Sequence, residues 1–145
     1  MIDANTERDY HVYGDGATIN AQGGNPAGCP SPKGEPSAVQ IYVTAVPEVG
    51  NGWITAYPYG STTPIDSLVN YRSDAQNVAN SGTIKTCFNC AKDINIKSLG
   101  GTTHVIIDVP GYYYELWPDW AESNRITFHK LGTSLRSKGV TNVKK

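Results

Sequence analysis

The sequence predicts an all-β domain built as an antiparallel β-sandwich of jelly-roll type. The chain has 15 Gly and 9 Pro among its 145 residues, and 9 Tyr against 2 Phe and 1 Met. Several runs alternate apolar and polar residues, and turn residues separate these runs. Alternation with a period of two is typical of half-buried strands, and short strands at close intervals are typical of sandwiches. The length is that of one domain with its own hydrophobic core.

The first 36 residues are so rich in Gly and Pro that we expect at most two short strands there, at residues 10–13 and 17–21. The pattern changes after Ser37. Apolar residues then alternate with more polar ones, which predicts an amphipathic strand. The residues of its apolar face are Val39, Ile41, Val43 and Ala45.

A turn at Pro47 and residues 50–52 follows this strand, and residues 53–59 resemble the returning strand of a hairpin. Ile54 and Ala56 are expected on one face of the returning strand. The residues expected on its other face are Trp53, Thr55, Tyr57 and Tyr59.

Later strands are expected at residues 67–71, from 77 to 87, at 93–97 and at 103–109, with a tight turn at Gly100-Gly101. The last of them is the most apolar. Helix is nearly absent from the pattern, and the single exception is a short helical turn expected at residues 118–125.

The chain has three cysteines, Cys29, Cys87 and Cys90, so at least one thiol lies outside any internal pairing. The spacing of Cys87 and Cys90 also suits a redox dithiol or half a zinc site. Two further zinc ligands at suitable spacing are missing, however, and strand-rich sequence stands where a redox motif would open a helix. We therefore favour a disulfide between Cys87 and Cys90, with Cys29 bonded to either of them as the alternative. Either pairing indicates an oxidising compartment.

Residues 103–113 resemble the C-terminal end of a domain found in secreted and surface proteins of bacteria. The signature of that family is Asp-Val, one variable residue, then Gly-Tyr-Phe, and this chain has Asp108-Val109-Pro110-Gly111-Tyr112-Tyr113. The segments that fall in matching order are 38–46, 52–60, Asn70-Tyr71 and 76–80. The resemblance covers residues 9–114 and implies export, β-architecture and a non-enzymatic role, and it supplies no catalytic residues.

The signature also has a physical interpretation of its own. The residues expected to face the core are Val105, Ile107 and Val109, opposite His104, Ile106 and Asp108. Asp108 followed by Pro110 and Gly111 predicts a corner, in which the carboxylate accepts hydrogen bonds from turn amides and Gly111 adopts an unusual backbone angle. This is a folding role rather than a binding one.

No arrangement of residues indicates catalysis. The Ser residues lie in ordinary turns, no pair of carboxylates stands out, and the Gly-rich stretches lack the lysine and helix of a phosphate loop. His11, His104 and His129 are isolated, and no loop repeats acidic residues at alternate positions. We therefore expect no enzymatic activity, no cofactor and no metal site.

The candidate ligand-binding residues are Trp53, Tyr57 and Tyr59, with Tyr42 on the facing strand. Their rings are expected on the polar face of the hairpin, and flat aromatic surfaces with nearby amides suit the weakly apolar faces of sugars. The alternative is structural. Cross-strand aromatic pairs stabilise sheets by roughly 0.2–1 kcal/mol each, and a second sheet or a neighbouring subunit would then cover them.

The C-terminal residues form a basic extension. Residues 121–145 hold six Lys and Arg against Glu122, a charge of +5, so the remainder of this chain of net charge −1 carries −6. We interpret the extension as a solvated tail rather than a polyanion site, and expect no nucleic acid partner. Residues 126–131 alternate, which predicts an edge strand that adds to its own sheet or to that of a neighbouring molecule. The alternative is a linker, so the predicted division is a sandwich at 9–114 and an extension at 115–145.

These observations favour a non-catalytic binding or adhesion module, secreted or at the cell surface, with a polysaccharide or cell-surface glycan as its partner. The main alternative is a structural subunit or spacer of a surface layer or filament, assembled by strand addition through residues 121–145. No apolar stretch is long enough to cross a bilayer, so we expect no membrane span.

Overall fold

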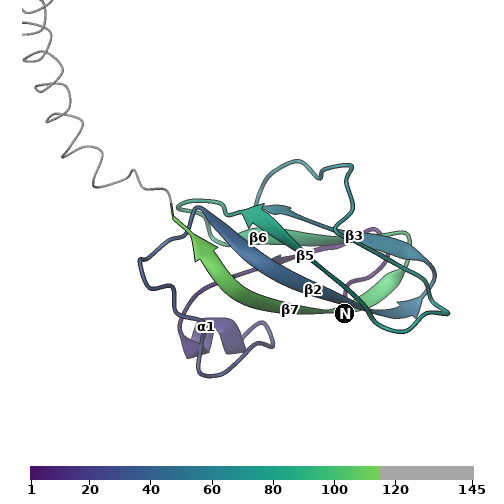
Figure 1. Cartoon of the computed structure of the whole chain (residues 1–145), viewed down its shortest axis with the longest axis horizontal. Helices are drawn as coiled ribbons and strands as arrows, with labels where there is room; N and C mark the ends of the chain where they lie inside the picture. The colour runs from purple at the N-terminus through teal and green to yellow at the C-terminus, as the bar shows by residue number, and fades with distance from the viewer. Residues whose placement is uncertain (115–145) are drawn as a thin grey trace, which may run out of the picture. The chain divides into compact units, whose positions relative to one another are not determined.

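Two antiparallel sheets packed against each other make up the fold, which the computed structural model describes for residues 1–114 (Figure 1). One sheet has the strand order β1 (Glu7–Tyr10), β6 (Ile94–Leu99), β3 (Gly52–Pro58) and β4 (Val69–Tyr71). The other has the order β5 (Val78–Lys85), β2 (Ala38–Val49) and β7 (Thr102–Tyr113). The predicted all-β sandwich is therefore confirmed.

The hydrophobic core lies between the two sheets. Because alternate residues of a strand point to opposite faces, one row of β2 is buried completely. That row consists of Val39, Ile41, Val43 and Ala45, each 0% exposed. Ile54 of β3 and Ile94 and Ile96 of β6 are equally buried and contribute the opposite side of the core.

The chain changes sheet where we expected a hairpin, so that prediction is wrong. β2 pairs with β5 and β7, whereas β3 pairs with β4 and β6. Gly50, at φ +75°, begins the crossing turn. The buried rows of β2 and β3 thus face each other across the core instead of lying side by side. Sequence alternation shows which face of a strand is apolar, but it does not show which strands pair.

The N-terminal region differs from its expected structure. Residues 17–21 lie mostly in α1 (Gly16–Asn20) rather than in a strand, because the side chain of Asp15 accepts a hydrogen bond from the backbone N–H of Thr18 at 2.8 Å and caps a helical turn. The first eight residues also belong to the sandwich, since Ile2 and Thr103 exchange two backbone hydrogen bonds. Residues 115–145, with their expected helical turn and edge strand, lie outside the described residues.

The signature segment is the second half of β7 and not a corner. Gln40 pairs with Gly111 and Tyr42 with Asp108, so two residues of β7 oppose one of β2 and form a bulge around Pro110. A bulge tolerates a residue without an N–H. The side chain of Asp108 is exposed, and its carboxylate accepts no hydrogen bond from any residue in 1–114; Gly111 has no positive φ. The expected alternation holds: Val105, Ile107 and Val109 pack against the core and His104, Ile106 and Asp108 are exposed.

Cys87 and Cys90 form a disulfide with a Cα–Cα distance of 5.7 Å, which confirms the favoured pairing and leaves Cys29 free. The bond closes the turn between β5 and β6, where the chain passes from the three-stranded to the four-stranded sheet.

Candidate functional site

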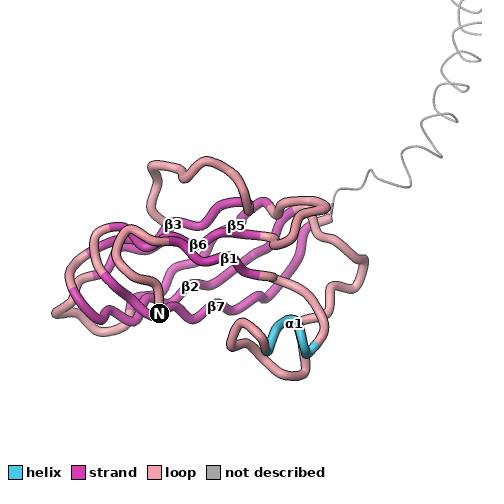
Figure 2. The backbone as a smooth tube through the Cα atoms, turned by 180° about the vertical axis from the view of Figure 1, so that it is seen from behind, coloured by secondary structure: helices cyan, strands magenta, loops and turns pink. Residues whose placement is uncertain are grey.

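The free edge of β7 is the first feature of the candidate site. β7 is the outermost strand of its sheet and pairs with β2 on one side only (Figure 2). The backbone N–H and C=O of Thr103 point away from β2, because they bond to Ile2 at 3.1 and 2.8 Å. Register with β2 is regular from Thr103 to Asp108, and every second residue of a strand directs its backbone groups to the same edge. Val105 and Ile107 therefore direct their backbone N–H and C=O groups away from β2, as Thr103 does. No residue in 1–114 bonds to those groups.

A cleft of about 460 Å³ lies along this free edge. Its first wall is β7 from Val105 to Val109, and its second wall comes from the N-terminal region. The second wall includes Tyr10, His11, Val12, Ile19, Gln22, Asn25 and Cys29. The unpaired backbone groups of β7 therefore open into a partly apolar hollow rather than onto a flat surface.

Hydrogen bonds hold the second wall in place. The side-chain amide of Gln22 donates to the carbonyl of His11 at 2.6 Å and accepts from its N–H at 2.9 Å, as a neighbouring strand would. Gly14 and Cys29 exchange two backbone hydrogen bonds of 2.9 Å. A side chain at Gly16 is impossible, since an added Cβ would lie 2.1 Å from the carbonyl oxygen of Pro26. These contacts preform the cleft.

Asp93 attaches this wall to the sandwich. Its carboxylate is buried and accepts a hydrogen bond from the backbone N–H of Val12 at 2.8 Å, and its own backbone N–H donates to the carbonyl of Tyr10 at 3.0 Å. The Nδ1 atom of His11 lies 3.8 Å from the same carboxylate. Burial raises the pKa of Asp93, and the Val12 hydrogen bond and His11 act against this rise.

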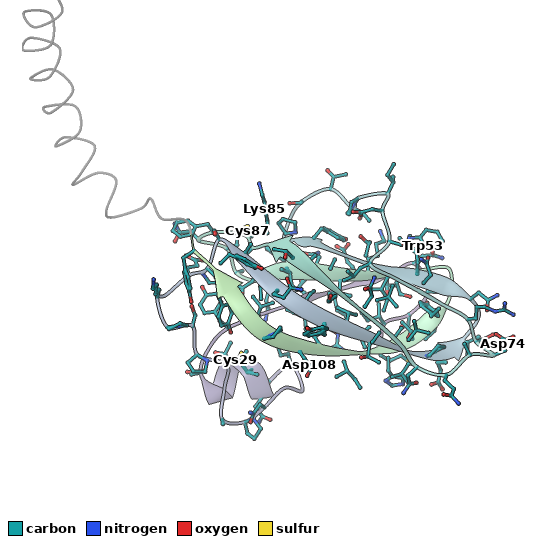
Figure 3. All side chains as sticks on the ribbon, in the orientation of Figure 1. Cys29, Trp53, Asp74, Lys85, Cys87 and Asp108 are labelled. Carbon is teal, nitrogen blue, oxygen red and sulfur yellow. A yellow bond between two sulfur atoms is a disulfide. The ribbon has the colours of Figure 1, made fainter. Side chains whose placement is uncertain are left out.

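Tyr112 closes one end of the cleft. Its hydroxyl donates to the carbonyl of Val12 at 3.0 Å and lies 2.9 Å from the thiol of Cys29. Burial raises the pKa of Tyr112, and the hydrogen bond with Cys29 adds to the rise. Figure 3 shows Cys29 and Asp108 along the lower side of the molecule, where α1 lies, and Trp53 on the upper side.

The four predicted ligand-binding residues do not form one surface. Tyr42 is 49% exposed on the outer face of the three-stranded sheet, whereas Trp53 is 38% exposed on the outer face of the other sheet. Tyr57 is only 3% exposed, and Tyr59 is half-buried beyond the end of β3. The change of sheet between β2 and β3 separates Tyr42 from the rest.

Tyr57 is covered by the loop between β3 and β4. Its hydroxyl donates to the carboxylate of Glu7 and lies 3.1 Å from the hydroxyl of Thr63 in that loop. Asp66 of the same loop accepts a hydrogen bond from Thr55 at 3.4 Å. Burial raises the pKa of Tyr57, and Glu7 reinforces the rise. Tyr57 therefore has packing and hydrogen-bonding partners within the fold.

Sequence reasoning found β7 but missed the cleft. Its second wall comes from residues 10–29, whose Gly and Pro content indicated only irregular chain. The one available signal was Gln22, a residue able to bond both groups of a backbone, and nothing in the sequence links it to His11. In residues 1–114 no three His, Cys, Asp or Glu side chains are placed to hold a metal ion, and no helix is long and apolar enough to cross a membrane.

Comparisons of the chain with models of known protein families, with curated proteins and with solved structures find no match. The function must therefore be argued from the geometry of the cleft.

Proposed function

We propose that the protein is a non-catalytic extracellular binding module that holds an extended polypeptide along the free edge of β7. The observation that carries this proposal is the set of unpaired N–H and C=O groups of Val105 and Ile107, which face a preformed cleft. An added strand would satisfy these groups with backbone hydrogen bonds, and its alternate side chains would enter the cleft. Each such hydrogen bond contributes about 0.5–1.5 kcal/mol net.

The cleft supports binding rather than catalysis. It contains a thiol and an imidazole, those of Cys29 and His11. Nucleophilic catalysis needs a hydrogen bond between the two. The contact of the Cys29 thiol is instead with the hydroxyl of Tyr112, and the contact of His11 is with Asp93.

Two observations support an extracellular setting. The Cys87–Cys90 disulfide is typical of oxidising compartments. The resemblance of residues 108–113 to a signature of secreted bacterial domains points the same way.

Selection of phage-displayed random peptides on the full chain tests the proposal. We expect enriched peptides with alternating apolar residues, which slow the amide hydrogen exchange of Val105 and Ile107 more than that of Ile106, whose N–H already faces β2. A glycan array is the parallel test of the predicted sugar ligand. Glycan binding that depends on Trp53 and leaves the two β7 amides unprotected would overturn the proposed site.

A further inference from the structure

We propose that residues 125–131 of a second copy of this chain occupy the free edge of β7, so that the protein assembles by strand addition. This inference rests on the proposed function, because it names the partner of the same edge. Three observations support it: the length of the free edge, the charge and pattern of residues 125–131, and the position of the N-terminal loop, which lies between residue 114 and the free edge of the same molecule.

The free edge has a defined extent. The Ile2–Thr103 pairing closes it at one end, and the contacts of Tyr112 with Val12 and Cys29 close it at the other. The open stretch from Val105 to Val109 measures about 17 Å at about 3.4 Å per residue. A strand of five to seven residues fits this stretch, and residues 125–131 have that length.

Pattern and charge favour this segment. Residues 125–131 read Arg-Ile-Thr-Phe-His-Lys-Leu, so Ile126 and Phe128 would enter the apolar part of the cleft beside Val12 and Ile19. No Lys or Arg of residues 1–114 lines the cleft, and the exposed Asp108 is among its lining residues. Residues 1–114 hold ten Asp and Glu against six Lys and Arg, a charge of −4, whereas residues 121–145 carry +5. The two parts of the chain are therefore opposite in net charge, and Asp108 places one negative charge at the cleft, opposite in sign to Arg125 and Lys130.

The structure favours a second copy over the chain's own segment. The hydroxyl of Tyr114, the last described residue, lies 2.5 Å from that of Ser31, and Tyr112 bonds to Val12. The N-terminal loop therefore lies against β7 between residue 114 and the open stretch. A segment that returned within one chain would have to pass over this loop, whereas a segment of another molecule would reach the edge from outside. Such a contact is heterologous, and each molecule would offer both a free edge and a segment.

Sedimentation of the full chain over a range of concentrations is the first experiment. We expect concentration-dependent assembly, which is lost when residues 125–131 are scrambled so that composition and charge stay and the alternation is broken. Asp108→Lys should weaken association about tenfold. Its control is Asp74→Lys, which makes the same charge change at the end of the molecule away from α1 and outside the cleft (Figure 3) and should alter association by less than about twofold. Unchanged assembly of the scrambled chain would overturn the proposal.

A mixing experiment tests the direction of the contact. The scrambled chain keeps the edge and loses the segment, while Val105→Pro keeps the segment and loses an edge-facing N–H. Neither should assemble alone, and their mixture should give a one-to-one dimer. Circular dichroism checks the folding of Val105→Pro. If that variant does not fold, Asp108→Lys replaces it, at a concentration where its about tenfold weaker association leaves it monomeric alone.

Amide exchange separates the two levels of the proposal. If the full chain stays monomeric while selected peptides still protect Val105 and Ile107, the second-copy partner is wrong and the proposed function stands. If no peptide protects these two amides, both the second-copy partner and the proposed function are wrong. Protection in a monomer at every concentration would identify the chain's own segment as the occupant and overturn the assembly.

Discussion

The carboxylate of Asp93 accepts a 2.8 Å hydrogen bond from the backbone N–H of Val12, across 81 residues of sequence. Both residues are buried, and this bond helps to attach the second wall of the cleft to the start of β6. Because burial raises the pKa of Asp93 above its ordinary value of 3.8, the native state holds the proton more tightly than the unfolded chain does.

A pH dependence follows from this raised pKa. The contribution of Asp93 to the free energy of unfolding is fully present below pH 3.8 and is lost as the pH rises through the native pKa. Asp93→Asn keeps an acceptor for the Val12 N–H and should abolish this component of the pH dependence. Asp93→Ala leaves the N–H unpaired and should cost about 1–3 kcal/mol. Urea unfolding of the three proteins between acidic and neutral pH measures both effects, and identical pH profiles would contradict the assignment.

Substitution by alanine should lower stability strongly at Gly52 and hardly at all at Gly111. A Cβ at Gly52 would lie 2.3 Å from the carbonyl oxygen of Leu99 and 2.6 Å from the hydroxyl of Tyr71, whereas a Cβ at Gly111 would meet nothing within 4 Å. We expect Gly52→Ala to cost about 3 kcal/mol and Gly111→Ala to change stability by less than about 0.5 kcal/mol. Chemical denaturation compares them, and a large loss at Gly111 would restore the corner expected from the sequence.

Alanine substitution should lower stability more at Tyr57 than at Trp53. Tyr57→Ala removes a ring that is 3% exposed and should cost about 3 kcal/mol or more. Trp53→Ala removes a ring that is 38% exposed and should cost about 1 kcal/mol. Thermal unfolding combined with a glycan array distinguishes the roles. A stable Tyr57→Ala variant that no longer bound a glycan would show a ligand contact instead.

Removal of the Cys87–Cys90 disulfide should have a modest effect. The two residues are three positions apart, so the bond closes a very short loop. The chain-entropy relation gives about 2 kcal/mol for such a loop. The double variant Cys87→Ser, Cys90→Ser should show this loss in urea unfolding, whereas Cys29→Ser leaves the disulfide intact and serves as the control. Equal losses in both variants would show that the disulfide is not the source.

The sequence was sufficient to predict strands and their faces, but not their pairing. The alternation of β2 identified its buried row because burial follows the two-residue period directly. The period does not show whether two strands lie side by side in one sheet or face each other in two sheets. The prediction that β2 and β3 form a hairpin was therefore wrong. The disulfide was predictable because Cys87 and Cys90 are close in the chain.

The cleft could not be predicted for a different reason. It depends on contacts between distant residues, such as Asp93 with Val12 and Tyr112 with Cys29. The pattern of apolar and polar residues within one segment does not indicate contacts between distant segments. Tyr57 was expected at a surface because its strand alternates correctly, but the loop that carries Thr63 and the side chain of Glu7 contact it.

The order of the strands also restricts when the protein can fold. β2 lies between β5 and β7, and its first residue, Ala38, pairs with Tyr113. During synthesis, the central strand therefore has an unpaired backbone edge until almost all of the described chain has emerged. Long-range pairing of this kind is slow and leaves apolar strands open to wrong partners meanwhile. Until β7 arrives, the unpaired backbone edge of β2 is the part of the strand that a chaperone would have to shield.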